Sequence, residues 1–164
     1  MTRAAMLALA AAVLALLPST ASAQRRGAGS AFFQGPIEVG PRAGRDFENH
    51  AWSLGVVARL PAAQRLEIRP SADAFFPKKG KTGWQANGDV DIKFGPGGTV
   101  YGGGGIAFVH LGGDKTRTGY NLFFGLISAQ PDAKVKPFLE FRWTFVNQTS
   151  PFRLVGGFTR RLGG

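Results

Sequence analysis

The sequence predicts an all-β protein: an eight-stranded antiparallel up-and-down barrel that follows a cleaved signal peptide. Three observations predict this class. The 164 residues include 24 glycines and no cysteine, which disfavours a helix bundle and excludes a disulfide scaffold. Clusters of turn residues divide the chain into segments of roughly ten residues. Within these segments apolar and polar side chains alternate, which is typical of strands.

The N-terminus has the features of a secretory signal peptide. Arg3 supplies a positive charge, residues 4–17 are uninterruptedly apolar, and Ala21-Ser22-Ala23 forms a small-residue cleavage site. The apolar run is shorter than the roughly 20 residues of a membrane-spanning helix. We therefore expect residues 1–23 to be removed and residues 24–164 to form one exported barrel domain.

The mature chain contains eight segments with the pattern of strands. They lie near 52–60, 65–75, 84–94, 99–109, 119–129, 135–145 and 152–160, with a weaker one at 33–41. Each is close to the 9 to 11 residues that a tilted strand needs to cross a bilayer. Connections at 61–64, 95–98 and 130–134 are tight, whereas those at 42–50, 76–83 and 110–119 are longer and more charged, and 146–150 is short. Pro70 and Pro137 each remove a ladder donor inside a predicted strand.

The alternation separates a charged face from an apolar one. In segment 65–75, Arg65, Glu67, Arg69 and Asp73 share one face, and no charge lies on the other. Period two does not by itself say which face is inside. A soluble lipocalin-like barrel with an apolar interior and a membrane barrel with a polar interior both have this pattern.

Two features favour the polar interior. Four aromatic residues with apolar-face parity fall at one rim of an up-and-down meander, as in an interfacial girdle: Trp52, Trp84, Tyr120 and Trp143. The polar face carries both signs of charge, which can pair inside a narrow lumen. The predicted ion-pair network consists of Arg59, Arg65, Glu67, Arg69, Asp73, Asp89, Asp91, Lys93, Glu140, Arg142 and Arg153.

These features together resemble the small outer-membrane β-barrel proteins of the OmpA-transmembrane and OmpX type. The resemblance covers residues 33–162 and is one of pattern rather than of a specific motif. It implies an integral barrel in the outer membrane of a Gram-negative-type cell, inserted by the barrel assembly machinery. Such proteins usually end in an aromatic residue that the assembly machinery recognises. This chain ends in Leu162-Gly163-Gly164, so Phe158 or Leu162 would have to take the place of that residue.

An eight-stranded barrel has an interior that side chains just fill, which predicts a structural envelope role rather than a pore. We expect no catalytic, cofactor-binding or metal-binding residues. Asp89 and Asp91 could form an acid-base pair, but the many arginines favour ion pairs. His50 and His110 lie at loop ends, and two histidines alone lack a third metal ligand.

The inward face of segments 99–109 and 119–129 carries no charge. This leaves open a small apolar pocket and, with it, a lipid-modifying barrel enzyme as a further alternative. The glycine run 102–105 is not followed by the Lys-Ser/Thr of a phosphate-binding loop, so that motif is rejected.

The formal charge of +10 gathers partly in the predicted loops. In an outer membrane these loops would face lipopolysaccharide phosphates, so we expect them to contact anionic headgroups. We expect the barrel to be a monomer and to bind no nucleic acid. The residues that carry the expectation of headgroup contact are Lys78, Lys79, Lys81, Lys115 and Arg117, joined by Arg42 and Arg45 from the predicted loop 42–50.

Overall fold

A computed structural model describes residues 33–78, 80–112, 115–128, 130, 133–147 and 149–162. The predicted signal peptide at 1–23 and Lys79 lie outside the described residues. No helix among the residues described is long and apolar enough to cross a membrane.

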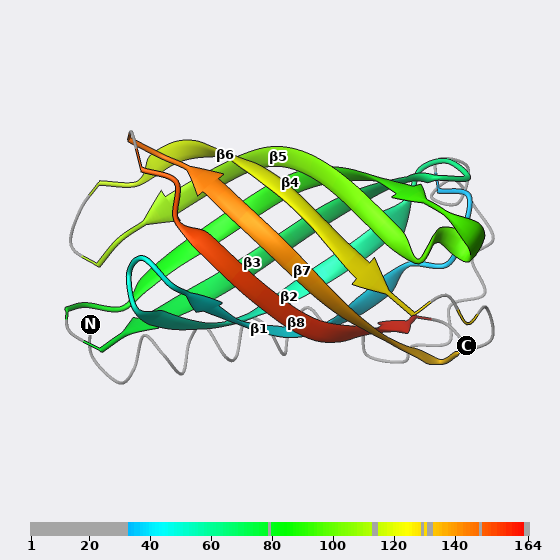
Figure 1. Cartoon of the computed structure of the whole chain (residues 1–164), viewed down its shortest axis with the longest axis horizontal. Coiled ribbons are helices and arrows are strands. Elements are labelled where there is room, and N and C mark those ends of the chain that lie inside the picture. The colour runs from blue at the N-terminus through cyan, green and yellow to red at the C-terminus, as the bar shows by residue number, and fades with distance from the viewer. Residues whose placement is uncertain are drawn as a thin grey trace, which may run out of the picture. The chain divides into compact units, whose positions relative to one another are not determined.

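Eight antiparallel strands form a closed barrel in which every strand pairs with its sequence neighbours and β1 pairs with β8 (Figure 1). A single turn of 3-10 helix, η1 (Pro96–Gly98), connects β4 to β5. The predicted eight-stranded up-and-down architecture is confirmed. The strands are β1 (Glu38–Asp46), β2 (Ala51–Pro61), β3 (Leu66–Pro77), β4 (Gly83–Phe94), β5 (Val100–His110), β6 (Arg117–Ile127), β7 (Val135–Phe145) and β8 (Phe152–Arg161).

The first strand differs most from its prediction: β1 spans Glu38–Asp46 and not 33–41. In sequence, the glycines, Pro41 and the charges of this stretch look like a loop. In the barrel, a Cβ on Gly40 would overlap the backbone carbonyl of Phe158 in β8, so glycine permits this close approach. Arg42 and Asp46 are buried at inward-facing positions, so neither is a loop residue.

The predicted contrast between tight turns and longer loops is wrong. The described residues of the connections 47–50, 78–82, 111–116 and 146–151 lie at one end of the barrel, called the loop end below. The described residues of the connections 62–65, 95–99 and 128–134 lie at the opposite end, called the turn end. The two sets have similar lengths, because β1 and β3 extend further toward the loop end than predicted and β6 begins earlier.

The two prolines inside strands are accommodated on the outer surface. Pro70 is exposed, and the ladder between β2 and β3 is interrupted beside it, between the pairs Val57↔Ser71 and Leu60↔Ile68. Pro137 is likewise exposed in β7. Each proline therefore removes a donor without exposing its ring to the charged interior.

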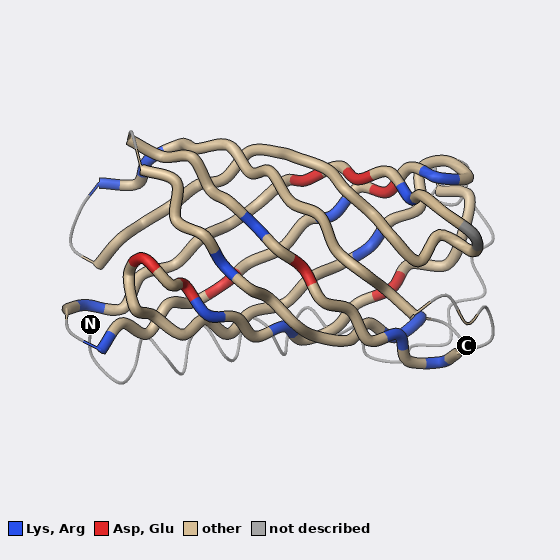
Figure 2. Tube along the Cα trace, in the orientation of Figure 1, with Lys and Arg blue, Asp and Glu red and all other residues tan. Residues whose placement is uncertain are grey.

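Burial alternates along the strands, and the polar face is the buried one. In β4, Gln85, Asn87, Asp89 and Asp91 are buried, whereas Trp84, Val90 and Ile92, which have the opposite parity, are exposed. The tube in Figure 2 carries blue and red segments along the middle of the barrel as well as at its ends. The structure therefore has the polar-inside arrangement, and the soluble barrel with an apolar interior is not what this chain forms.

Candidate functional site: the lumen and its loop end

The lumen holds equal numbers of basic and acidic side chains. Of the described residues, twelve charged side chains are buried outright, and Lys93 and Lys136 are largely covered at the turn end. Equal numbers of opposite charges favour ion pairs, which offset the cost of removing the charges from water. The basic members are Arg42, Arg59, Arg69, Lys93, Lys136, Arg142 and Arg153, and the acidic members are Glu38, Asp46, Glu67, Asp73, Asp89, Asp91 and Glu140.

Two arginines form the middle layer of the lumen. Arg69 on β3 donates to Asp91 at 3.0 Å and to Glu140 at 2.6 Å. Arg142 on β7 donates through Nε to Glu140 at 2.8 Å, and its Nη2 lies 2.8 Å from an Asp89 oxygen. These contacts link β3, β4 and β7 across the interior, so the layer connects strands that are not neighbours.

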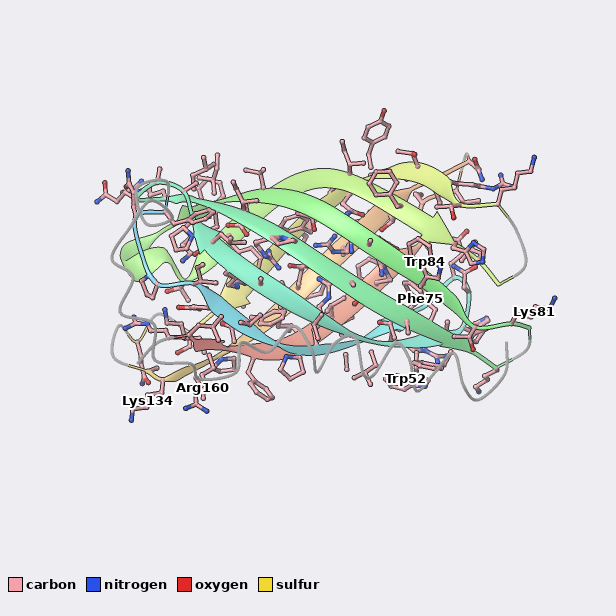
Figure 3. The ribbon with its side chains drawn as sticks, turned by 180° about the vertical axis from the view of Figure 1, so that it is seen from behind. Trp52, Phe75, Lys81, Trp84, Lys134 and Arg160 are labelled. Atoms are coloured by element: carbon pink, nitrogen blue, oxygen red, sulfur yellow. The ribbon has the colours of Figure 1, made fainter. Side chains whose placement is uncertain are left out.

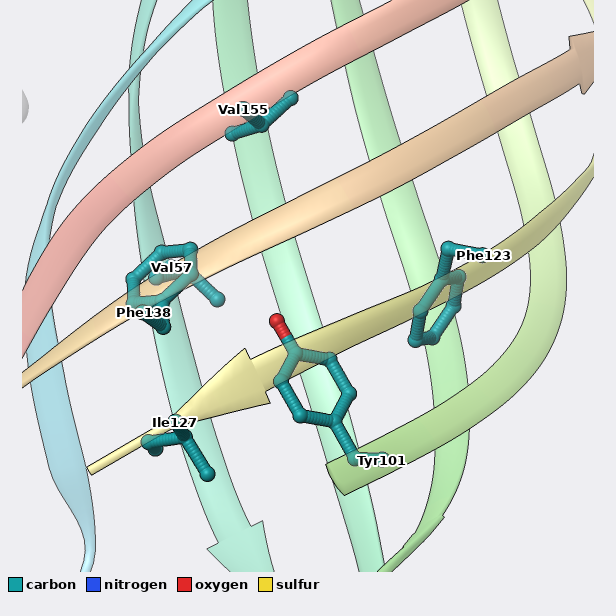
Figure 4. Packing of buried hydrophobic residues seen from close by; sticks show 6 residues of the cluster. All are labelled: Val57, Tyr101, Phe123, Ile127, Phe138 and Val155. Carbon is teal, nitrogen blue, oxygen red and sulfur yellow. The ribbon is translucent and has the colours of Figure 1, made fainter. Parts of the chain in front are cut away.

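Strands β5 and β6, whose buried side chains carry no charge, complete this layer with aromatic rings (Figure 4). The Arg69 guanidinium lies 4.7 Å from the ring centroid of Tyr101 and 4.9 Å from that of Phe123, and Arg142 lies 4.5 Å from Phe123. These are cation–π distances. The Tyr101 hydroxyl also donates to Glu140 at 3.1 Å. Tyr101 and Phe123 thus fill the side of the lumen where an apolar pocket was a possibility from the sequence.

The glycines of β5 and β6 allow this packing. A Cβ on Gly125 would lie 2.5 Å from the Tyr101 hydroxyl, and one on Gly105 would lie 2.2 Å from the Gly88 carbonyl oxygen. Both distances are far below van der Waals contact. Glycine at these positions therefore lets the tyrosine ring and the β4 backbone occupy space that a side chain would take.

The loop end of the lumen has a second cluster. Asp73 accepts from Nε of Arg42 at 2.8 Å and pairs with Arg42 Nη2 as well. Arg153 donates through Nη2 to the Thr144 hydroxyl at 2.8 Å. The amide side chains of β4 and β6 continue the network, since Asn121 donates to Asn87 and to Asp89, each at 2.8 Å.

The turn end is closed by a third cluster. Arg59 donates to Glu67 at 3.0 Å, and Lys93 pairs with the other oxygen of the same carboxylate. Lys136 donates to Glu38 at 2.6 Å across the closing seam of the barrel. The three clusters together place ion pairs at successive levels from one end of the lumen to the other.

The structure places all but one of the predicted network residues in the lumen. Arg65 is the exception: it is exposed and precedes β3, so its side chain lies outside the barrel interior. Lys136 belongs to the network in addition to the predicted residues, and so do three residues of β1: Glu38, Arg42 and Asp46. Glu38, Arg42 and Asp46 alternate with Gly40 and Gly44 on one face of β1, and this alternation in the sequence would have identified them as inward-facing.

The candidate acid-base groups are engaged in the network or lie elsewhere. Asp89 contacts Asn121 and Arg142, and Asp91 contacts Arg69. His110 at the end of β5 stacks on Trp84 with ring centroids 5.7 Å apart, and His50 is exposed in the first loop. The two carboxylates therefore serve as acceptors for arginine and asparagine.

The predicted girdle residues face outward near the loop end. Trp52 is 59% exposed, Trp84 38% and Tyr120 66%, and Trp143 packs on Phe152 at 5.1 Å. Figure 3 shows Trp52 and Trp84 at the same end as Lys81, with Lys134 and Arg160 at the other. Arg45 also belongs here: it lies in β1 rather than in a loop, with its guanidinium 5.1 Å from the Trp52 ring centroid.

The predicted headgroup-binding cations lie at the loop end where the structure describes them. Lys78 and Lys81 are exposed between β3 and β4, Lys115 is exposed before β6, and Arg117 is exposed at the start of β6. Lys79 lies outside the described residues. Arg42, which we assigned to a loop, belongs to the lumen instead because β1 continues through it.

Comparison with known proteins finds similarity at the level of structure. No protein-family model matches the chain, and no curated protein does. The N-terminal β-barrel domain of OprF from Pseudomonas aeruginosa matches with a TM-score of 0.67 and 15% identity, over 79% of this chain and 98% of that one. Neisserial surface protein A matches with a TM-score of 0.55 and 16% identity, over 77% of this chain and 94% of that one.

A de novo designed transmembrane β-barrel matches with a TM-score of 0.53 and 11% identity, over 78% of this chain and 96% of that one. At such low sequence identities, these structural matches establish the fold of the chain and not its function. In its strand number, its closed meander and its polar-inside arrangement, the chain has the fold of the small eight-stranded outer-membrane β-barrels.

Proposed function

We propose that this protein is an integral outer-membrane barrel with a structural role in the envelope, present as a monomer. The observation that carries the proposal is the outer surface. Large apolar side chains on successive strands are 40 to 60% exposed, which in water would create an apolar surface far larger than soluble monomers tolerate. A bilayer removes that cost. Examples on four strands are Leu54, Ile92, Ile106 and Leu122.

The filled lumen supports a structural role over transport. Eight strands enclose an interior that side chains just fill, and here the filling consists of paired charges at three levels. Removing one partner from a buried pair leaves an uncompensated charge, which typically costs about 3 to 5 kcal/mol. A solute that displaced these pairs would meet the same penalty, so the proposed barrel is closed.

The proposal includes no enzymatic activity. Acid-base catalysis needs a group that is free to take or give a proton within reach of a substrate. Asp89, Asp91 and Glu140 are each at most 1% exposed and are held by arginines. A lipid-modifying activity would also need a pocket on the uncharged side of the lumen, which Tyr101 and Phe123 occupy.

Two partners follow from this location. The loop-end cations Lys78, Lys81 and Lys115 would face lipopolysaccharide phosphates, with Lys79 and Arg117 beside them in sequence. At the other end of the chain, Phe158 and Leu162 face outward and are 47% and 41% exposed. They offer the barrel assembly machinery apolar side chains on the last strand and just after it.

Membrane fractionation with a gel-shift assay tests the location. We expect the mature protein in outer-membrane pellets, and we expect its mobility on gels to change between unboiled and boiled samples, because the closed barrel resists detergent. A soluble monomer in the osmotic-shock fraction, stable without detergent, would contradict the proposal.

Lysine replacement tests the headgroup contact. Gln substitutions at Lys78, Lys81 and Lys115 should weaken association of the refolded barrel with lipopolysaccharide-containing vesicles, and the difference should disappear at high salt. Lys134→Gln at the turn end is the matched control, since it removes an exposed charge from the opposite rim. Equal association of the triple variant and the control with these vesicles would contradict the proposed contact between the loop lysines and lipopolysaccharide.

A further inference from the structure

A cavity of about 400 Å³ opens at the loop end of the lumen, above the ion-pair layers. Its size lies in the range of small-molecule binding sites. Polar and apolar residues both line it: Gln85, Thr144 and Arg153 on one hand, and Phe75, Val109 and Val146 on the other.

Arg153 lines this cavity and has one hydrogen-bond donor that no described residue accepts. Its side chain is 1% exposed, and its Nη2 donates to Thr144. Its Nη1 is buried and has no hydrogen-bond partner among the described residues. The nearest carboxylate oxygen is on Asp73, at 3.8 Å, and that oxygen already pairs with Arg42.

The neighbouring acid, Asp46, makes no hydrogen bond to Arg153 among the contacts of the described residues. Asp46 lies opposite Arg153 in the pairing of β1 with β8. One Asp46 oxygen accepts from the Asn49 backbone N–H at 2.8 Å, and the other accepts from the Asn49 side-chain amide at 2.9 Å. Asn49 thus contacts both oxygens, neither of them accepts a hydrogen bond from Arg153, and the buried Nη1 N–H of Arg153 lacks an acceptor among the described residues.

We propose that this cavity binds a small organic carboxylate with an apolar body. A guanidinium is the preferred partner of a carboxylate because its donors match the two oxygens in geometry and charge. The Arg153 guanidinium lies 5.1 Å from the Phe75 ring centroid, so its plane is supported before the ligand arrives.

The apolar walls distinguish an organic acid from an inorganic anion. Val109, Leu111, Val146 and Pro151 line the cavity and offer contact to a hydrocarbon group, which phosphate or sulfate could not use. At the rim, Lys81 favours the approach of an anion, whereas Glu48 is placed to meet an ammonium group if the acid carries one. The site adds ligand capture at the loop end to a barrel whose deeper lumen is closed.

Titration of the refolded barrel with benzoate tests the proposal. Benzoate combines a carboxylate with an apolar ring, benzyl alcohol keeps the ring without the charge, and inorganic phosphate keeps a charge without the ring. Chemical shifts of the loop-end amides, including that of Thr149, should move with benzoate and saturate. Benzyl alcohol and phosphate should bind at least about tenfold more weakly, since each lacks one of the two contacts.

Two variants assign the site. Arg153→Met removes the donor and keeps a side chain of similar length on Phe75, and it should weaken benzoate binding about tenfold or more. Ala51→Phe leaves Arg153 in place and fills part of the cavity, because Ala51 is a lining residue, so it should abolish binding. Arg160→Gln, outside the barrel at the turn end, is the control and should bind as the wild type does.

Heat-modifiable mobility verifies that each variant is folded before titration. Should Arg153→Met fail this check, Ala51→Phe still decides the question. Absence of saturable shifts in the wild type, wild-type affinity in either folded variant, or equal binding of benzoate and benzyl alcohol overturns the proposal. Tighter binding of phosphate than of benzoate overturns the assignment to an organic acid.

Discussion

Replacing Arg69 with methionine tests whether the lumen is held together by its middle ion-pair layer. Methionine keeps much of the volume beside Tyr101 and Phe123 but removes the guanidinium. Two carboxylates then lose a donor: Glu140, which accepts at 2.6 Å, and Asp91, which accepts at 3.0 Å. Both are buried, so water does not replace the lost contacts at low cost.

The two carboxylates differ in what remains to them. Glu140 keeps the Arg142 Nε bond at 2.8 Å and the Tyr101 hydroxyl. Asp91 keeps no other hydrogen-bond donor among the described residues, and its Oδ1 is already without one. Stranding one partner of a buried ion pair costs about 3 to 5 kcal/mol, so we expect a loss of that size in the free energy of unfolding.

Urea unfolding of the barrel in lipid vesicles, followed by tryptophan fluorescence and by gel mobility, measures this loss. Arg65→Met is the matched control because it makes the same chemical change at an exposed position, where we expect an effect within about 0.5 kcal/mol. The double variant Arg69→Met, Asp91→Asn should recover about 1 to 3 kcal/mol of the loss, since the asparagine leaves no stranded charge.

A result in which Arg69→Met costs less than about 1 kcal/mol, or costs no more than Arg65→Met, would refute the reasoning. Such a result would mean that the lumen arginines are solvated or free to find other partners. No recovery in the double variant would mean that the stranded charge on Asp91 is not the source of the loss.

Three further predictions concern the two faces of the barrel. Leu122→Arg at the centre of β6, where Leu122 is 55% exposed, should cost about 2 to 4 kcal/mol in vesicles, whereas in a soluble barrel it would be nearly neutral. Gly105→Val should prevent formation of the heat-modifiable barrel because its Cβ would overlap the β4 backbone; Gly88→Ala, with no atom within 4 Å, should fold normally. Tyr101→Phe removes the hydroxyl that donates to Glu140, and urea unfolding should show a loss of about 1.5 to 3 kcal/mol.

Most strand positions could be predicted because each strand carries its own signal. β7 has the predicted bounds, and β2 to β6 and β8 differ by at most two residues. Alternation and turn residues are local, so they can be recognised without knowing the partner strands. β1 was the failure because its evidence is not local: Gly40 is required by the approach of Phe158, which is 118 residues later in the chain (158 minus 40).

The sequence predicted which residues belong to the ion-pair network better than it predicted which of them pair with each other. Parity assigned Arg59, Arg69, Arg142 and Arg153 to the inside, and they are buried there. Parity misplaced Arg65, because one residue more or less at a strand end decides whether a side chain enters the lumen or faces solvent. It gave no information on the cavity at the loop end, since that cavity forms only where four loops and the ends of several strands meet.

The amino-acid sequence by itself determined that the chain makes eight alternating strands and which residues share a face, because period two is a property of neighbouring residues. Only the tertiary structure decided which charges meet. Arg69 reaches Glu140 71 residues away and Lys136 reaches Glu38 98 residues away, across a closed barrel. Such contacts depend on strand tilt, stagger and closure, which no single strand specifies.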